Sequence, residues 1–243
     1  MRSYVITLRD NPASVAATEK LLLSSEMVQN DFEPLIFDAV TPEDVNSQMS
    51  RYALRWAYPD QGEVVDFLSG LTKRAYQTAD PKKRIACFLS HYSLWLMCAA
   101  ENVPYLILEH DAQFLRQVPT HHLLEEMDRQ NLGVLGLNDP RGATRKSQVF
   151  YESIVRPAAE VGARKVVMQC PMVDEDVRIP QGLAGNSAYI IRPMFAKKML
   201  QAVDEFGAWP NDALMCKQLF PGKLGVTYPF YTNIQRMEST TTL

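Results

Sequence analysis

The sequence predicts a single α/β domain with a partly parallel sheet. The chain opens with a strand–helix–strand pattern, and a long amphipathic helix later leads into an apolar strand without alternation. Such a strand fits the centre of a sheet that helices cover on both faces. The 243 residues are 47% hydrophobic and 22% charged, as expected for a globular protein with a sizeable core.

Residues 1–83 carry the first elements. The apolar run 3–8 (SYVITL) predicts a buried strand, and 32–40 (FEPLIFDAV) a second short strand. Between them, 11–27 predicts a helix, because Pro12 stands near its start and good helix formers follow. Residues 41–83 hold prolines and glycines among short amphipathic pieces, and we expect a helical insertion on the sheet there.

The strongest helix signal lies in residues 84–100 (RIACFLSHYSLWLMCAA). Its apolar side chains follow the spacing of one buried helical face: Phe88, Tyr92, Trp95, Leu96 and Ala99. Pro104 then breaks the chain, and 105–111 (YLILEHD) predicts a central strand.

The second half of the chain predicts fewer long elements. We expect long connections with a strand or hairpin inside over residues 140–183. The remaining expected elements are strands at 131–139 and 185–193, helices at 194–206 and 211–220, and a closing segment at 225–235.

Charge and cysteine content exclude several classes of protein. A net charge of −3 provides no global attraction to nucleic acid or anionic lipid. No stretch reaches the ~18 apolar residues of a membrane helix, and the first ten residues lack the apolar core of a signal peptide. The four cysteines form no C-x-x-C pair, so we expect reduced thiols, no zinc site and a cytoplasmic protein. A peripheral position at the inner membrane face, or a viral protein in a host cytoplasm, stays open.

One pair of acids stands out by its position. The acid-x-acid pattern occurs four times, against about three expected by chance. Only Glu109 and Asp111 end a predicted central strand, where ligands bind in open α/β sheets. Two carboxylates there are costly unless water or a cation neutralises them, and Mg²⁺ or Mn²⁺ prefers such oxygen ligands. A solvated strand end with a helix-capping acid is the alternative.

The surroundings of this pair carry a family resemblance. "IACFLSHYSLW" followed by "PYLILEHDAQFL" resembles the central signature of glycosyltransferase family 25, with matches at Ser90, His91, Trp95, Glu109 and Asp111. "SYVITLRDNP", "GNSAYIIRPMFAKKML", "PNDALM" and "IQRMESTT" are similar to further segments of that family. The resemblance spans nearly the whole chain and leaves 41–83 and 140–180 unmatched.

The resemblance implies a GT-A-like, Rossmann-type mixed sheet flanked by helices, which binds a nucleotide-sugar through Mn²⁺ or Mg²⁺. Glu109 and Asp111 match the metal motif, with Asp111 the more direct ligand, while His110 replaces the usual second acid. The positions implied to contact the donor are Thr7, Leu8, Ser90, His91, Glu109, His110, Gly185, Asn186, Tyr189 and Gln235. Structural roles stay open for Ser90 and His91 as braces of the sheet, and for Gly185, Asn186 and Tyr189 as parts of an ordinary strand.

An inverting transferase also needs a carboxylate that takes the proton of the attacking hydroxyl. The family match implies Asp212 for this role, with Asp139, at the end of its own strand, in reserve. The alternative for Asp212 is stabilisation of a helix dipole.

Three functions remain open from the sequence. The leading one is sugar transfer from a nucleoside diphosphate donor, UDP-sugar above all, to a hydroxyl of a glycolipid or oligosaccharide. The second acceptor is a hydroxymethylated base in DNA, as in modified viral genomes, since phosphate contacts need only local positive charge. The basic residues in question, which otherwise form a solvated face, are Arg51, Arg55, Lys73, Arg74, Lys82, Lys83, Arg84, Arg141, Arg145 and Lys146. The third possibility is a module that binds nucleotide-sugar without transferring it.

Overall fold

A computed structural model describes residues 1–142, 146–160, 162 and 166–235 of the chain. Its centre is a seven-stranded sheet in the order β2-β1-β5-β9-β7-β10-β8. The sheet strands are β1 Arg2–Thr7, β2 Pro34–Asp38, β5 Tyr105–Glu109, β7 Val134–Gly136, β8 Val166–Gln169, β9 Ala188–Ile191 and β10 Leu224–Tyr228. Two small sheets pair β3 Glu63–Val65 with β4 Thr72–Arg74, and β6 Ala112–Phe114 with β11 Thr232–Ile234.

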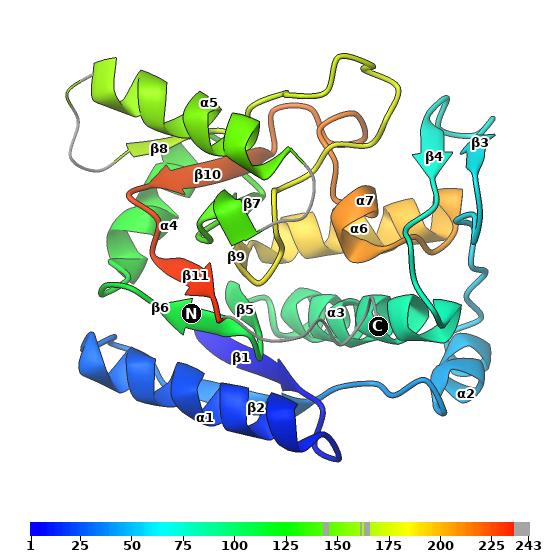
Figure 1. The fold of residues 1–243 in the computed structure, drawn as a ribbon, viewed down its shortest axis with the longest axis horizontal. Helices are drawn as coiled ribbons and strands as arrows, with labels where there is room; N and C mark the ends of the chain where they lie inside the picture. The colour runs from blue at the N-terminus through cyan, green and yellow to red at the C-terminus, as the bar shows by residue number, and fades with distance from the viewer. Residues whose placement is uncertain (143–145, 161, 163–165, 236–243) are drawn as a thin grey trace.

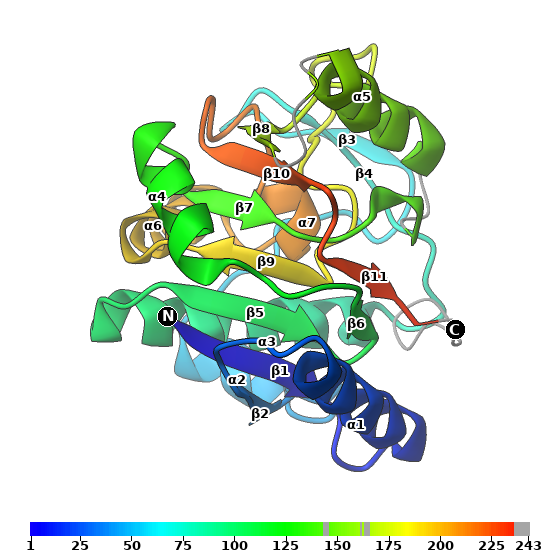
Figure 2. The same cartoon turned by 90° about the vertical axis from the view of Figure 1, so that its left-hand side faces the viewer.

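Helices cover both faces of the sheet (Figures 1 and 2). They are α1 Pro12–Met27, α2 Val45–Arg51, α3 Pro81–Glu101, α4 Thr120–Arg129, α5 Ser147–Glu160, α6 Pro193–Phe206 and α7 Asn211–Leu214, with a 3-10 turn at Pro140–Gly142. One core cluster joins the sheet to α3 and α6, and a second joins the opposite face to α1 and α4. This arrangement confirms the predicted α/β class with a mixed sheet.

Strand direction gathers several loop ends at one edge of the sheet. β1 is parallel to β2 and β5, whereas β9 is antiparallel to β5 and β7. Leu108, near the end of β5, is therefore paired with Ala188 at the start of β9. The carboxyl ends of β1, β2 and β5 and the amino end of β9 meet at this edge, where ligands bind in open α/β sheets.

The predicted central strand and its preceding helix are confirmed. The first four residues of β5 are fully buried: Tyr105 and Ile107 face the α3 cluster, and Leu106 and Leu108 face the α1 cluster. The next residue, Glu109, therefore points to the α3 side, because side chains alternate along a strand. Helix α3 begins at Pro81 after Asp80, whose side chain accepts a hydrogen bond from the Lys82 amide at 2.9 Å.

Several expected elements differ from the structure. Within the insertion 41–83, only α2 and the first residues of α3 are helical, and the β3–β4 hairpin lies between them. Val64 and Val65 of this hairpin are exposed, so the hairpin has no alternating apolar pattern. The segment 140–183 contains the strand expected inside it, β8, and also an unexpected helix, α5, which tolerates Pro157 near its end. The expected helix 211–220 stops at Leu214, because Cys216 forms a bridge to Gly182.

Candidate active site

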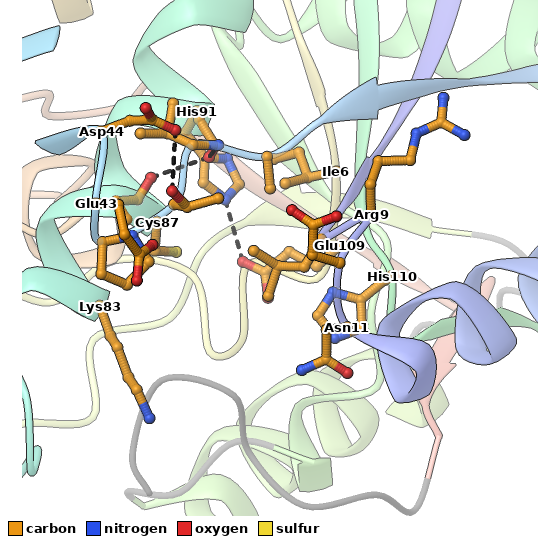
Figure 3. Close-up of a pocket in the computed structure, with 18 of the residues that line it drawn as sticks. Ile6, Arg9, Asn11, Glu43, Asp44, Lys83, Cys87, His91, Glu109 and His110 are labelled. Atoms are coloured by element: carbon orange, nitrogen blue, oxygen red, sulfur yellow. Dashed lines mark hydrogen bonds and ion pairs between the residues drawn. The ribbon is translucent and has the colours of Figure 1, made fainter. Parts of the chain in front are cut away.

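A cavity of about 1080 Å³ opens at the carboxyl ends of β1, β2 and β5 (Figure 3). Its walls come from the loop between β1 and α1, the loop between β2 and α2, and the first half of α3. Of the residues predicted to contact a donor, five line it: Leu8, Ser90, His91, Glu109 and His110. The cavity thus lies where the sequence predicted a ligand site.

A chain of buried hydrogen bonds holds Glu109. The Nε2 atom of His91 lies 3.1 Å from Oε1 of Glu109, and its Nδ1 lies 2.8 Å from the hydroxyl of Tyr189. That hydroxyl also accepts a hydrogen bond from Nε1 of Trp95 at 3.0 Å. One proton assignment satisfies every group: Tyr189 donates to Nδ1, and a neutral His91 donates from Nε2 to the Glu109 carboxylate.

This chain keeps Glu109 ionised. Burial alone raises the pKa of Glu109, but the hydrogen bond from His91, with smaller effects of His110 and Arg84, lowers its pKa below the usual value. A carboxylate that accepts a hydrogen bond from a fixed donor is a stable negative charge at the cavity wall. Glu109 is therefore preorganised to face a cation.

Asp111 is held differently. Burial raises its pKa to about 7, and the negative charge of Glu109 contributes. Its Oδ1 atom is buried and has no hydrogen-bond partner within the described part of the chain. A buried carboxylate oxygen without a partner, beside an ionised carboxylate, is costly unless a cation or a proton compensates it. The pair Glu109 and Asp111 therefore fits a divalent cation with a preference for oxygen ligands.

Gln235 fixes the turn that carries these acids. Its backbone amide donates to the carbonyl of Asp111 at 2.7 Å, and its Nε2 reaches the carbonyls of Ala17 at 2.8 Å, Ala112 at 3.1 Å and His110 at 3.3 Å. The structure places Gln235 as a clamp on this turn. A direct contact of Gln235 with a donor remains a prediction. Residues 236–243, the end of the fourth family-like segment, lie outside the described residues.

Polar atoms without partners lie next to Glu109 at the start of β9. The Glu109 amide donates to the carbonyl of Ser187 at 2.8 Å. Neither side-chain polar atom of Asn186, which is 6% exposed, has a hydrogen-bond partner within the ranges that the structure covers. Gly185 precedes it with φ +77, a left-handed conformation that favours glycine. This loop can therefore offer a polar ligand unused amide groups.

Asp212 lies in the same electrostatic environment as Glu109. Its Oδ2 accepts a hydrogen bond from the Tyr76 hydroxyl at 3.0 Å, and its Oδ1 accepts one from the Ala213 amide at 3.0 Å. Burial raises the pKa of Asp212, and the charge of Glu109 raises it further, against the lowering effects of Tyr76 and Arg84. A buried carboxylate near the acid pair is well placed to accept a proton.

Some predicted site residues make contacts that hold elements of the fold together. Thr7 is 1% exposed, and its hydroxyl lies 2.8 Å from that of Thr18, so it joins β1 to α1. Tyr189 is fully buried, and its hydroxyl contacts His91; a contact of Tyr189 with a donor stays a prediction. Ser90 accepts a hydrogen bond from the Val40 amide at 2.9 Å and fastens the pocket loop to α3.

Asp139 is not the free carboxylate that a reserve base would need. Its Oδ2 lies 2.6 Å from Nη2 of Arg141, and its Oδ1 accepts the Arg141 amide at 3.0 Å. The Arg141 guanidinium also lies 4.2 Å from the ring centroid of Tyr151. Asp139 thus anchors the 3-10 turn that follows β7, and the structure does not support it as a base.

Cys87 was not predicted from the sequence as a site residue. Ligand atoms of Cys87, His91 and Glu109 lie within 4.8 Å of one another, close enough to hold a metal ion. The available signal was the spacing of Cys87 and His91, four residues apart on a predicted helix. Burial raises the pKa of the Cys87 thiol well above its usual value, and the charge of Glu109 adds to this effect. The thiol is therefore a poorer ligand at neutral pH than the two carboxylates.

The predicted basic surface is interrupted. Lys73 is 3% exposed and lies 3.1 Å from the Asp66 carboxylate, so it cannot contact a phosphate backbone. Arg74 pairs with Glu63 at 2.5 Å, and Arg145 lies outside the described residues. In the described ranges, no helix is long and apolar enough to cross a membrane.

The comparison with protein families agrees with the resemblance. Residues 2–215 match the family described as Glycosyltransferase family 25 (LPS biosynthesis protein). Among solved structures, the apo form of mouse xyloside xylosyltransferase 1 aligns with a TM-score of 0.39 and 10% identity, over 93% of this chain and 84% of that chain. No curated protein matches the chain significantly.

The state of Asp111 gives a testable prediction. Its folded pKa of about 7 exceeds the ordinary 3.8, so its ionisation destabilises the metal-free fold as pH rises between these values. We expect Asp111→Asn to raise the melting temperature in EDTA at about pH 8 and the gain to vanish near pH 4. Millimolar Mn²⁺ should stabilise the wild type and not this variant.

The matched control is Glu126→Gln, which alters a half-buried acid that pairs with Arg129 at 2.5 Å. This variant should show neither the gain in EDTA nor the loss of Mn²⁺ stabilisation. Thermal unfolding at several pH values measures both effects, and an equal Mn²⁺ response in Asp111→Asn and the wild type would contradict the assignment.

Proposed function

The chain belongs to glycosyltransferase family 25, and from that premise we propose that it transfers a sugar from a nucleoside diphosphate donor, UDP-sugar above all, to an acceptor hydroxyl. The observation that carries the proposal is the acid pair that follows from the end of β5: Glu109 lines the cavity, and Asp111, two residues later, has a raised pKa and a buried carboxylate oxygen without a partner in the described residues. A divalent cation that prefers oxygen ligands would compensate the negative charge of both carboxylates.

The cavity suits the donor in size and position. Its volume of about 1080 Å³ lies near the upper end of the usual range for small-molecule sites, roughly 300–1,000 Å³. Its apolar walls include Ile6 and Leu8, which can pack on a nucleoside, while Glu109 and His110 mark the polar end. The donor would therefore lie with its diphosphate toward β5.

Glu109 and Asp111 would hold Mn²⁺ or Mg²⁺. When bound, the cation neutralises the negative charge of the diphosphate leaving group. His91, fixed by Tyr189 and Trp95, keeps the Glu109 carboxylate oriented and charged in the meantime. The preorganised carboxylate needs no rearrangement when the donor enters.

Asp212 acts on the acceptor side. The acceptor oxygen attacks the anomeric carbon as the bond to the diphosphate breaks on the opposite face, and the hydroxyl proton passes to the Asp212 carboxylate. This geometry inverts the anomeric configuration. Burial raises the proton affinity of Asp212, and the Tyr76 hydrogen bond keeps its ionised form accessible.

A saccharide of a glycolipid is the acceptor class we favour. The family is described as LPS biosynthesis proteins. The burial of Lys73 and the pairing of Arg74 leave the DNA alternative without a continuous basic face on this part of the chain.

Donor binding tests the proposal first. We expect UDP with Mn²⁺ to stabilise the fold by ~2.7 kcal/mol at a concentration of about 100 Kd, and EDTA to remove the effect. A thermal-shift screen of nucleotide-sugars, followed by Mn²⁺-dependent release of UDP, measures binding and turnover separately. Binding without any release, with every saccharide acceptor tried, would favour a nucleotide-sugar-binding module. The absence of a shift with any nucleoside diphosphate would refute the donor assignment.

The proton acceptor is tested by Asp212→Asn. Loss of a general base typically lowers the rate 10²–10⁴-fold, and we expect turnover to fall by that order. Affinity for UDP, measured by calorimetry, should stay near that of the wild type, because the asparagine keeps the size and the Ala213 contact. The control is Asp139→Asn, which alters the carboxylate paired with Arg141. Its turnover should stay near that of the wild type, because Asp212 is unchanged in this variant. Normal turnover of Asp212→Asn would remove Asp212 from the mechanism.

A further inference from the structure

The loop between α6 and α7, which leads to Asp212, is held by the first part of the insertion. The amide of Ala57 donates to the carbonyl of Ala208 at 2.9 Å, and the amide of Ala208 donates to the carbonyl of Arg55 at 2.8 Å. Gly207 has φ +81, and a Cβ there would lie 2.6 Å from the Cβ of Ala57. The two segments are thus in backbone contact (Figure 1).

The β3–β4 hairpin provides a second attachment. Nζ of Lys73 lies 4.2 Å from the ring centroid of Trp209 and donates to the carbonyl of Ala57 at 2.5 Å. Its ion pair with Asp66, at 3.1 Å, compensates the buried charge. Lys73 is 3% exposed and Trp209 is fully buried, so this cation–π contact is shielded from solvent.

The third attachment reaches the carboxylate itself. Two residues after β4, the Tyr76 hydroxyl donates to Oδ2 of Asp212 at 3.0 Å. The Tyr76 ring stacks on Tyr58, with centroids 5.8 Å apart and an interplanar angle of 18°, and Arg84 lies 4.8 Å above it. Burial raises the pKa of Tyr76 well above its usual value, so the hydroxyl stays a hydrogen-bond donor.

We propose that residues 55–76 of the insertion 41–83 are the scaffold that sets the position and ionisation of Asp212, and that Tyr76 is its positioning residue. The inference rests on the proposed function, in which Asp212 accepts the acceptor proton. A phenol that donates to Oδ2 while the Ala213 amide donates to Oδ1 fixes the carboxylate plane. It also favours the ionised form, which the buried site would otherwise disfavour.

Other groups near Asp212 also affect its pKa. Arg84 of α3 favours its ionised form, Glu109 of β5 opposes it, and the buried thiol of Cys87 stays neutral. None of these groups changes when the Tyr76 hydroxyl is removed. A change in the titration of Asp212 would therefore report the loss of the Tyr76 hydrogen bond.

Tyr76→Phe tests the inference, because it removes the hydroxyl and keeps the ring that stacks on Tyr58. The control is Tyr52→Phe in the same insertion, where the ring packs on Tyr92. We expect turnover of Tyr76→Phe at pH 7 to fall about tenfold, the size of one hydrogen bond to a charged group. The acid limb of the pH–rate profile should move to higher pH, with UDP affinity unchanged. Tyr52→Phe should match the wild type in all three.

A second readout does not depend on activity. In protein labelled with ¹³C at aspartate carboxyls, the resonance that disappears in Asp212→Asn belongs to Asp212. Its titration midpoint should rise in Tyr76→Phe. A raised midpoint in a protein without transferase activity would support the positioning role while the proposed function fails. An unchanged midpoint together with an unchanged pH–rate profile, in active enzyme, would overturn the inference and leave the proposed function intact.

Discussion

The hydrogen bond from His91 to Glu109 is the interaction on which the candidate site depends. It favours the ionised form of the half-buried Glu109 carboxylate at the end of β5, against the effect of burial on its pKa. His91 donates this hydrogen bond from Nε2, because the contacts among Tyr189 of β9, Trp95 of α3 and His91 are consistent with one tautomer of His91. Burial, together with the negative charge of Glu109, raises the pKa of the neighbouring Asp111, which therefore retains a proton to a higher pH. The two acids therefore form one unit that a cation would complete.

The sheet topology makes this interaction possible. Glu109 and Tyr189 lie on strands that run in opposite directions, so the end of β5 meets the start of β9. Helix α3 then presents His91 and Trp95, four residues apart, to the same face. Gln235, after β11, hydrogen-bonds the carbonyls of Asp111 and Ala17 and so joins the turn that carries the two acids to α1. Segments separated by more than a hundred residues thus converge on two carboxylates.

Much of this framework could be predicted from the sequence, because its helices and strands follow from patterns of neighbouring residues. Periodicity was enough for α3, and an unbroken apolar run was enough for β5. The exception among local elements is α5, where Pro157 and adjacent glycines masked a face formed by Phe150, Ile154 and Ala158. A pattern within one segment identifies the element but not the partner of its polar groups.

The parts that could not be predicted are the partners of the polar side chains. Asp139 looked like a base at a strand end, yet the pairing with Arg141 was visible only in three dimensions. Tyr189 matched the family motif, but its hydroxyl points at His91 and not into the cavity. Tyr76 and Asp212 are 136 residues apart, and nothing in either local sequence indicates their contact. Sequence therefore located the site, while the structure assigned its residues to separate tasks.

The location of a bound cation tests the central claim most directly. Crystals soaked with Mn²⁺ and UDP should give one anomalous scattering peak in contact with the carboxylates of Glu109 and Asp111, between them and the diphosphate. His91 should keep its hydrogen bond to Glu109 in that complex. A peak held by Cys87 and His91, with Asp111 uncoordinated, would contradict the account, because it would make His91 a metal ligand instead of the donor that keeps Glu109 charged.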